Sequence, residues 1–295
     1  MTKSTVSLVL GSGAARGLAH IGILRWLGEN DFEVRSIAGS SMGALVGGIY
    51  AAGKLDIYED WVLALEPMDV LRLLDVSWNW TALLKGDRII DALRELVGDQ
   101  NIEDLPIAFT AVATDIESEK EVWLSKGSLF DAIRASIAIP TIFTPHEING
   151  RRLLDGGLTN PVPIAPTLND ATDFTIAVNL NAQSERLGAP AEKRPRKPKG
   201  ESVSYHEKIR SFIDGLQTTF GAKSTKDWDL VDIITRSFDT MQSQVARLKL
   251  AAYSPDVIIS IPRNAARAFE FDRAAEMIEL GYQKAQSELS HLRKA

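Results

Sequence analysis

A Gly-x-Ser-x-Gly stretch, Gly39-Ser40-Ser41-Met42-Gly43, combines residue types that can carry out nucleophilic chemistry. The apolar run Val34–Ala38 before it predicts a strand, and the small residues of Ala44–Tyr50 after it predict a helix. A serine presented by a sharp strand-to-helix turn needs neighbours with almost no side chain, and the two glycines meet that need. The N-terminus of the helix would stabilise negative charge beside Ser41. The stretch therefore predicts a serine nucleophile, with a plain Gly/Ser turn as the alternative.

A second glycine-rich stretch, Gly11-Ser12-Gly13-Ala14-Ala15-Arg16-Gly17, follows the apolar run Val6–Leu10, which predicts a buried parallel strand. The backbone N–H groups of such a loop can bind an anion. A dinucleotide site is one interpretation, but the glycine spacing differs by one from G-x-G-x-x-G, and no acidic residue ends the second strand. We therefore predict an oxyanion hole in which the N–H groups of Gly13 and Ala14 face an intermediate on Ser41. Two turns that follow adjacent parallel strands lie at the same edge of a sheet.

The predicted base is a carboxylate, Asp155, which ends a short apolar run and precedes Gly156 and Gly157. A serine nucleophile needs a group that takes its proton, most often a histidine. The positions of the histidines in the sequence favour packing or solvent-exposed roles for all of them: His20, His146, His206 and His291. Direct action of Asp155 on Ser41 is then the simpler arrangement, provided that burial raises its pKa from about 4. The alternative is an Asp-Gly β-turn.

In this order, the three motifs resemble those of the patatin-like phospholipases. Gly11–Gly17 matches the oxyanion loop of that family, Gly39–Gly43 its nucleophile, and Asp155–Gly157 its dyad aspartate. Ala132–Pro140 is similar to the helix that leads to the strand before the aspartate, and Phe109–Asp115 is similar to the central strand. The resemblance is closest to the compact bacterial RssA-type subgroup, which is related to the catalytic domain of neuropathy target esterase.

The resemblance implies that a dyad of Ser41 and Asp155 hydrolyses fatty acid esters, such as phospholipids or lysophospholipids, through an acyl-enzyme. It implies further that the oxyanion loop is formed by Gly11, Gly13, Ala14, Arg16 and Gly17, and that the elbow and the dyad are supported by Gly39, Met42, Gly43, Gly156 and Gly157. We expect the guanidinium of Arg16 to order the loop, with contact to a phosphate as the alternative. The family usually has three successive glycines where this chain has Ser12 and Ala14 around Gly13, so the exact donors stay open. The alternative function is a regulatory or partner-binding protein on the same fold.

The composition agrees with a cytoplasmic enzyme that uses no cofactor and no metal. The chain has 295 residues, of which 45% are hydrophobic and 24% charged, and this is enough to bury one sizeable core. It contains no cysteine, and we find neither a signal peptide nor an apolar run of about 18 residues. The net charge of −6 argues against a nucleic acid partner. The expected partner is an acyl-lipid or ester substrate, with local, peripheral contact to a membrane and no protein partner specified.

The expected fold is an α/β three-layer sandwich with a mostly parallel central sheet and helices on both faces. Besides the first two strands, the pattern predicts strands at Phe109–Thr114, Glu121–Leu124, Arg152–Asp155, Phe174–Asn179 and Val257–Ile261. A single hydrolase domain is expected over residues 1–295, with a catalytic core at about 5–180, a mobile, basic, proline-rich loop at about 183–204, and a helical C-terminal region at about 205–295. The last helix is expected from Asp272 to Lys294.

One densely apolar stretch, Pro67–Gly86, supports two interpretations. It contains Trp78 and Trp80 within three residues. It is either a core helix and turn that pack on the sheet, or a cap over an acyl-binding groove that meets lipid, since tryptophan favours interfaces. The proline-rich loop likewise has a second interpretation as a basic segment that contacts a membrane.

Overall fold

The structure is a computed structural model that describes residues 3–65, 86–185 and 230–292. Contacts divide the chain into two units, one comprising Met1–Glu185 with Phe238–Ala295 and the other Arg186–Ser237. The fold described below is that of the first unit. The prediction of one domain over the whole chain stays a prediction, because most of the second unit lies outside the described residues.

The first unit is built on one mixed, mostly parallel sheet of eight strands in the order β5-β6-β3-β2-β1-β7-β8, with β4 paired to β3. The strands are β1 (Ser4–Leu10), β2 (Phe32–Ser40), β3 (Ala108–Asp115), β4 (Lys120–Leu124), β5 (His146–Ile148), β6 (Arg151–Asp155), β7 (Phe174–Ala182) and β8 (Val257–Pro262). The pairs among β3, β2, β1, β7 and β8 are parallel. Both β4 and β6 pair with β3 in the antiparallel sense, and β5 pairs with β6 in the same way.

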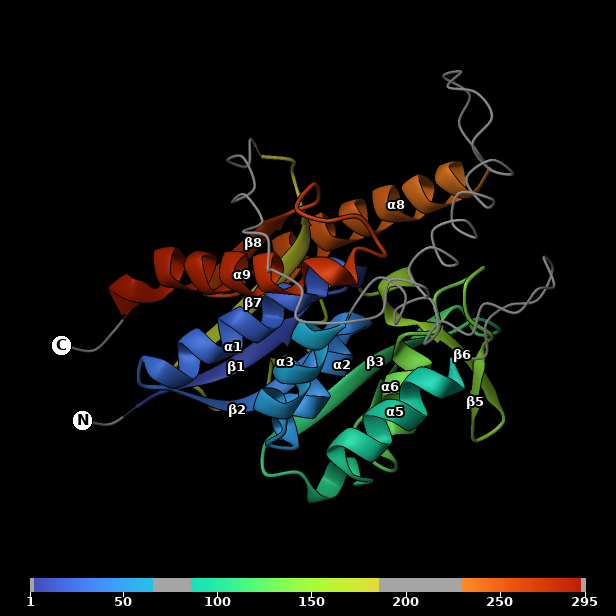
Figure 1. Ribbon diagram of the computed structural model, residues 1–295, viewed down its shortest axis with the longest axis horizontal. Helices are drawn as coiled ribbons and strands as arrows, with labels where there is room; N and C mark the ends of the chain where they lie inside the picture. The colour runs from blue at the N-terminus through green and yellow to red at the C-terminus, as the bar shows by residue number, and fades with distance from the viewer. Residues whose placement is uncertain (1–2, 66–85, 186–229, 293–295) are drawn as a thin grey trace, which may run out of the picture. The chain divides into compact units, whose positions relative to one another are not determined.

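Helices cover both faces of this sheet, which confirms the predicted three-layer α/β fold (Figure 1). They are α1 (Ala19–Glu29), α2 (Met42–Ala51), α3 (Leu55–Ala64), α5 (Asp87–Val97), α6 (Leu129–Ser136), α8 (Leu230–Tyr253) and α9 (Ala274–Leu289). Alternate β1 residues Val6, Leu8 and Leu10 belong to the large core cluster that includes side chains of α1, α2 and α9. On the other face, Val9 of β1 packs in a second cluster with Ala246 of α8.

The strand and helix patterns of the sequence account for most of these elements. All seven predicted strands occur, each with ends within a few residues of the prediction. The predicted last helix corresponds to α9, which is flanked by short 3₁₀ turns at Phe271–Arg273 and Ser290–Leu292. Strand β5 was not predicted, and it places His146 in a strand. With only three residues, β5 is too short to show a strand periodicity, and it exists because it pairs with β6.

The register of the sheet brings the ends of β1, β2 and β6 to one level, next to Val112 and Ala113 of β3. Leu10 of β1 pairs with Gly39 of β2, so the turns that follow these strands begin side by side. Ser40 pairs with Val112 of β3, and the next β3 residue, Ala113, pairs with Asp155 of β6. The glycine-rich loop, the Gly-x-Ser-x-Gly turn and Asp155 therefore meet at the same edge of the sheet.

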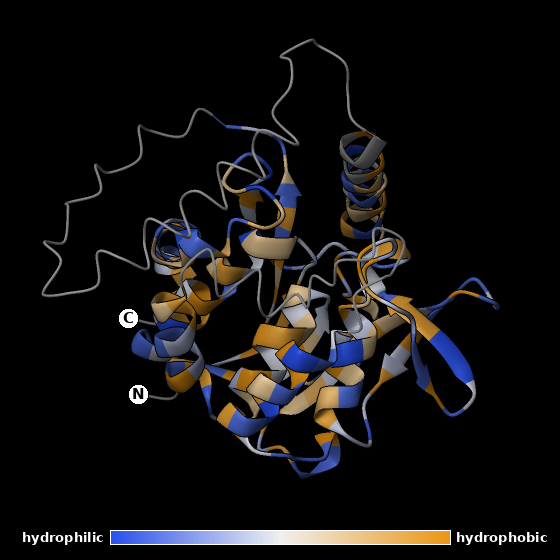
Figure 2. Cartoon of the chain, turned by 45° about the vertical axis from the view of Figure 1, so that its right-hand side comes forward, coloured by the Kyte–Doolittle hydropathy of each residue, from blue (hydrophilic) through white to orange (hydrophobic). Residues whose placement is uncertain are grey.

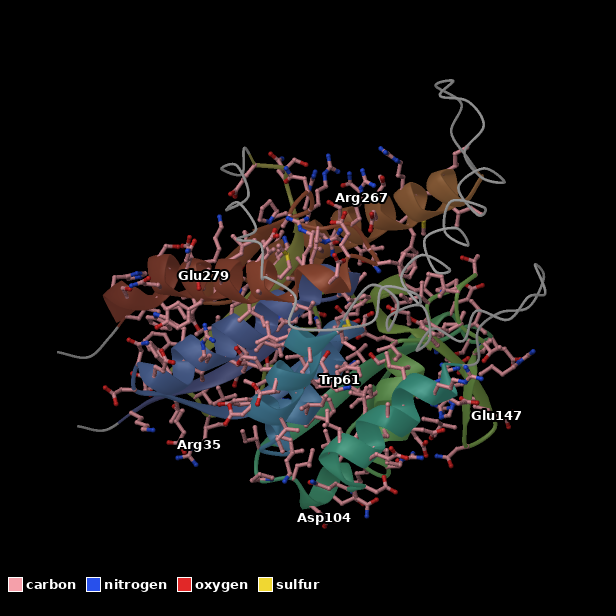
Figure 3. The ribbon with its side chains drawn as sticks, in the orientation of Figure 1. Arg35, Trp61, Asp104, Glu147, Arg267 and Glu279 are labelled. Atoms are coloured by element: carbon pink, nitrogen blue, oxygen red, sulfur yellow. The ribbon has the colours of Figure 1, made fainter. Side chains whose placement is uncertain are left out.

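Hydrophobic and hydrophilic residues alternate along several of the surface helices (Figure 2). Helix α5 is amphipathic and buries Ile90, Leu93 and Val97, whereas α2 is almost wholly apolar and buried. The charged side chains of Arg35, Asp104 and Glu147 lie at the margin of the ribbon in Figure 3, and Glu279 lies on α9. Within residues 3–65, 86–185 and 230–292, no helix has the length and hydrophobicity that crossing a membrane requires.

Three predicted segments fall wholly or mainly outside the described residues. These are the apolar stretch Pro67–Gly86, of which Gly86 alone is described, the proline-rich loop beyond residue 185, and the first part of the helical C-terminal region, residues 205–229.

Candidate active site

Ser41 occupies a strained position between β2 and α2. Its φ of 56° and ψ of −123° lie in a region that residues other than glycine rarely adopt. The turn is closed so tightly that a Cβ on Gly39 would lie 2.4 Å from the carbonyl oxygen of Gly43. A Cβ on Gly43 would lie 1.9 Å from the carbonyl oxygen of Leu10. The two glycines are therefore required by close backbone approach, as predicted for a nucleophile elbow.

The side chains of Ser41 and Asp155 are in direct contact. The Ser41 hydroxyl donates a hydrogen bond of 2.6 Å to Oδ2 of Asp155. The other carboxylate oxygen, Oδ1, accepts a 2.7 Å bond from the N–H of Gly157, in the 3₁₀ turn Gly156–Leu158 that follows β6. Both side chains are buried, with 3% exposure for Ser41 and 1% for Asp155. Residues 114 positions apart in the sequence thus form one hydrogen-bonded pair.

The environment of Asp155 makes it a stronger base than a carboxylate in water. Burial raises its pKa to about 7, and the hydrogen bonds from Ser41 and Gly157 oppose part of that rise. Removal from water disfavours the charged carboxylate, so the group holds a proton more readily than its usual pKa would allow. A carboxyl group that titrates near neutral pH can both accept and return a proton under physiological conditions.

The glycine-rich loop after β1 leaves two adjacent N–H groups without an acceptor among the described residues. The N–H groups on either side of them are used: Ser12 donates to the carbonyl of Pro161 at 2.8 Å, and Ala15 donates to that of Ala268 at 3.1 Å. No such bond involves the N–H of Gly13 or Ala14. Ala14 has a φ of 47°, and it begins the 3₁₀ turn Ala14–Leu18. These are the two donors that the sequence predicts.

Arg16 lies behind the loop, where it holds the backbone from inside the protein. Its guanidinium is 4% exposed and donates to the carbonyl of Arg263 at 3.3 Å, to the carbonyl of Ala266 at 3.4 Å and to Oδ1 of Asn181 at 3.2 Å. An ion pair of 3.5 Å joins it to Asp239 of α8. Arg16 therefore links the glycine-rich loop to β7, to the segment after β8 and to α8, and its ordering role stays a prediction.

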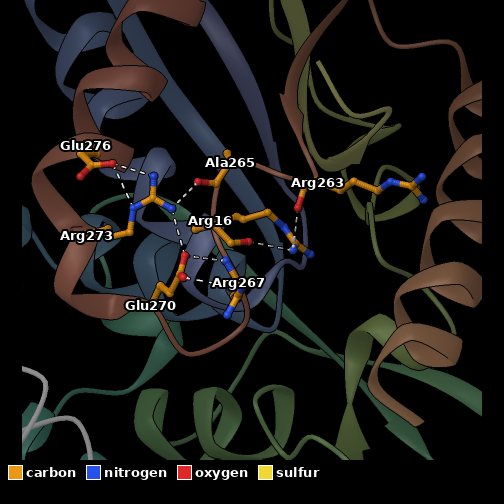
Figure 4. Close-up of polar contacts among 8 residues, drawn as sticks. Arg16, Arg263, Ala265, Arg267, Glu270, Arg273 and Glu276 are labelled. Carbon is orange, nitrogen blue, oxygen red and sulfur yellow. Dashed lines mark hydrogen bonds and ion pairs between the residues drawn. The ribbon is translucent and has the colours of Figure 1, made fainter. Parts of the chain in front are cut away.

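The segment after β8, whose carbonyl groups accept hydrogen bonds from Arg16, is also bound by Arg273, as Figure 4 shows. The Arg273 guanidinium donates to the carbonyl of Ala265 at 2.8 Å, to Glu270 at 2.9 Å and to Glu276 at 2.6 Å. The carbonyl groups that Arg16 binds therefore belong to a loop with its own ion-pair network.

The remaining predicted site residues line the same edge of the sheet. Gly11 donates its N–H to the carbonyl of Val178, and Gly17 lies against Met42, since a Cβ on Gly17 would be 2.3 Å from Cβ of that residue. Gly156 lies against the backbone of β3, since a Cβ on Gly156 would be 2.1 Å from the carbonyl oxygen of Val112. The structure thus brings together the predicted residues of the elbow, of the glycine-rich loop and of the turn Gly156–Leu158 that follows Asp155, which we call the dyad turn.

Neither histidine near this edge contacts Ser41. His20 is fully buried, its Nε2 lies 2.9 Å from the carbonyl oxygen of Gly11, and burial lowers its pKa to about 4. His146 pairs with Asp131 at 3.7 Å. Within the described ranges, no cluster of three or more His, Cys, Asp or Glu residues is placed to hold a metal ion.

Two residues of the site were not identified from the sequence. Ser136, at the end of α6, accepts the N–H of Ser41 at 2.9 Å. Gln242 of α8 accepts a 3.1 Å bond from the hydroxyl of Ser12 in the loop. Buried polar residues on otherwise apolar helix faces were the available signal, but periodicity alone does not say which loop they meet.

The comparisons with known proteins show the family of this chain. A family model described as Patatin-like phospholipase matches residues 8–168, more than half of the chain. An uncharacterised NTE family protein of Mycobacterium bovis is 38% identical, covering 94% of this chain and 89% of its own length. The neuropathy target esterase of Drosophila melanogaster is 30% identical over 63% of this chain and 13% of its own length. Lysophospholipase NTE1 of Candida glabrata is 29% identical over 63% of this chain and 11% of its own length. The chain belongs to the patatin-like phospholipase family.

Proposed function

We propose that this protein is a serine ester hydrolase that removes acyl groups from phospholipids or lysophospholipids, with Ser41 as the nucleophile and Asp155 as its base. The single observation that carries the proposal is the 2.6 Å hydrogen bond between Ser41 Oγ and Asp155 Oδ2 at a strained, glycine-enclosed turn. Family membership supports hydrolysis of lipids in general. The dyad and the acyl-enzyme are inferred from the contacts of the two side chains.

In the first half of the reaction, Ser41 Oγ forms a bond to the ester carbonyl carbon while its proton passes to Asp155 Oδ2. The carbonyl oxygen becomes an oxyanion. As the tetrahedral intermediate collapses, the ester C–O bond breaks, and Asp155 returns the proton to the departing alcohol oxygen. The product is an acyl group esterified to Ser41.

In the second half, water takes the place of the alcohol. Asp155 accepts a proton from the water, whose oxygen attacks the acyl carbon, and the bond to Ser41 then breaks as the proton returns to Oγ. A base with a pKa of about 7 suits both directions, because each step requires it to gain and then lose a proton near neutral pH.

The oxyanion would be held by backbone N–H groups that the fold leaves available. The N–H groups of Gly13 and Ala14 have no acceptor among the described residues. The same holds for the N–H of Met42, the first residue of α2. The N-terminus of α2 adds the positive end of a helix dipole at Ser41. Preorganised donors of this kind are worth about 10²–10³ in kcat each.

A fluorophosphonate probe on the purified protein tests the proposal. The probe should react covalently with the wild-type protein at Ser41, and Ser41→Ala should abolish both labelling and the release of fatty acid from lysophospholipid vesicles. The thermal unfolding temperature should change little, because only one hydroxyl is removed. Wild-type protein that is folded but neither labels nor hydrolyses lysophospholipid or p-nitrophenyl esters would overturn the proposal.

The acyl-lipid class is tested by a series of p-nitrophenyl esters from acetate to laurate. If the acyl chain is buried next to Ser41, kcat/KM should rise with chain length by at most the free energy of burying each methylene, about 0.8 kcal/mol. A maximum at acetate with a steady fall towards laurate would instead indicate a hydrolase of small esters.

A further inference from the structure

The segment at the end of α6 contacts the backbone of both members of the Ser41–Asp155 pair. The hydroxyl of Ser136 accepts the N–H of Ser41 at 2.9 Å. Two residues later, the carbonyl of Ala138 accepts the N–H of Asp155 at 2.9 Å. Three consecutive residues thus hold two turns that lie 114 positions apart in the chain.

The hydroxyl of Ser136 also links two strands at the point where they cease to pair. The last pair between β2 and β3 is Ser40 with Val112, and beyond it the chain turns sharply at Ser41. Ser136 Oγ donates a 2.6 Å bond to the carbonyl of Val112 while it accepts from Ser41. The hydroxyl therefore connects the first N–H of the strained turn to the carbonyl of the central strand.

The surroundings of Ser136 leave little freedom for this arrangement. The side chain is fully buried, and its one donor and one acceptor bond have distances typical of well-formed hydrogen bonds. The Val112 carbonyl is enclosed on a further side by Gly156 of the dyad turn, where a built Cβ would lie 2.1 Å away. Displacement of the hydroxyl would free the N–H of Ser41 and the carbonyl of Val112 together, and both lie in a buried position.

We propose that Ser136 is a positioning residue for the reaction: its hydroxyl fixes the backbone of Ser41 and, together with the Ala138 carbonyl, sets the separation of Ser41 Oγ from Asp155. This inference rests on the proposed function, since it assigns Ser136 a role in a reaction at Ser41. The Ser136 hydroxyl bonds to the backbone of Ser41 and Val112, whereas the proton transfer runs between Ser41 Oγ and Asp155 Oδ2.

The test compares Ser136→Ala with Ser136→Cys and with Ser7→Ala as a matched control. Ser136→Cys keeps a side chain of similar size but replaces a strong hydroxyl donor and acceptor with a weak thiol. Ser7 is also fully buried and donates a 2.9 Å bond to Asp170, but it pairs with Ser36, five residues before Ser41. Its loss should lower stability without changing the turn.

We measure the unfolding temperature of each variant. The rate of fluorophosphonate labelling, and kcat and KM for a soluble p-nitrophenyl ester, are measured well below that temperature. Ser136→Ala should lower the labelling rate and kcat by about tenfold to a hundredfold with KM within about twofold, because small misplacements of a nucleophile have effects of this size. Ser136→Cys should give a smaller loss in the same direction. It also replaces Ser136→Ala as the test if that variant does not fold. Ser7→Ala should react like the wild type.

The pH profile separates positioning from a loss of folded protein. The hydrogen bond from Ser41 lowers the pKa of Asp155, so loosening Ser41 should move the acid limb of kcat/KM to higher pH. Wild-type rates and an unmoved acid limb in Ser136→Cys or folded Ser136→Ala would overturn the positioning role while leaving the proposed function intact. Absence of labelling at Ser41 in the wild type would overturn both.

Discussion

The turn after β2 and the turn after β1 lie side by side at one edge of the sheet, yet they are held in different ways. The turn after β2 is closed in part by its own residues, because Gly39 packs against Gly43 and the strained Ser41 between them directly precedes α2. The loop after β1 is held by partners more than 140 positions away, including Pro161, Asn181 and Ala268. The turn after β2 thus combines a local glycine closure with contacts to Ser136 and Leu10, whereas the loop after β1 depends mainly on distant partners.

This difference separates two tasks. The nucleophile must be presented in one strained conformation, and glycines within five residues can enforce that conformation. The N–H donors must face the nucleophile from another strand, so their placement depends on the elements that pack behind the loop. Changes in the two turns should therefore fail in different ways, and the predictions below run from the largest expected effect to the smallest.

Asp155→Asn should have the largest effect on catalysis. An amide cannot accept the proton of Ser41, so kcat should fall by about 10³- to 10⁴-fold across the pH range. Steady-state kinetics with a p-nitrophenyl ester measures the loss. As controls, His146→Ala and His291→Ala should each cost less than tenfold, and a thousandfold loss in either folded variant would reveal a histidine in the reaction.

Gly43→Ala should disrupt the turn after β2 and its close approach to the end of β1. Its Cβ would lie 1.9 Å from the carbonyl oxygen of Leu10, so either β1 or the turn has to move. We expect the free energy of unfolding to fall by about 3 kcal/mol or more, as for severe overpacking of a core.

The matched control is Gly28→Ala in α1, where nothing lies within 4 Å of the new Cβ. It should raise the free energy of unfolding by about 0.5–1 kcal/mol through helix propensity. Denaturant titration followed by circular dichroism compares the two. Equal stabilities of the two variants would contradict the close approach of the turns.

Arg16→Met should disturb the loop but spare the elbow. It removes hydrogen bonds to two backbone carbonyls and to Asn181 from a buried position, which should lower the free energy of unfolding by about 2 kcal/mol. The rate of fluorophosphonate labelling should fall by about tenfold, while Ser41 remains the labelled residue. Asp239→Asn is the control, because that carboxylate is 44% exposed and should contribute less than about 1 kcal/mol. A larger loss from Asp239→Asn would show that the ion pair, and not the carbonyl contacts, orders the loop.

The pH dependence of stability should reveal the base without any substrate. Burial raises the pKa of Asp155 to about 7 in the folded protein, above its value of about 4 in the unfolded chain. The folded state therefore binds more protons between these values, and the carboxyl group makes folding less favourable as pH rises from about 4 to 7. Asp155→Asn should accordingly gain stability relative to the wild type between pH 5 and pH 8. An unfolding-temperature difference that does not change over this range would contradict the raised pKa.

The sequence alone was enough to predict the sheet, the two turns and the two interacting side chains. Apolar runs that end in glycine-rich stretches reveal buried strands and the turns that follow them, because both signals lie within a few residues. An aspartate followed by two glycines at the end of a strand is also typical of a β-turn, so the prediction of Asp155 as the base depended on its resemblance to the dyad aspartate of the family.

The support of the site could not be predicted in this way. Ser136 lies on a helix whose sequence does not say that its hydroxyl meets the N–H of Ser41. Strand β5 is too short to carry a periodic signal, so the strand position of His146 was missed. Gln242 comes from α8, which reaches the loop after β1 across 230 residues of sequence.

The amino-acid sequence by itself determined which residues can react and the strained turn that presents one of them, because glycine spacing and strand-to-helix transitions are local properties of the chain. The tertiary structure decided the distance between Ser41 and Asp155, the pKa of that carboxyl group, and which N–H groups of the loop are left without an acceptor. These quantities depend on burial and on partners far apart in the chain, and both arise only when the sheet and its covering helices pack together.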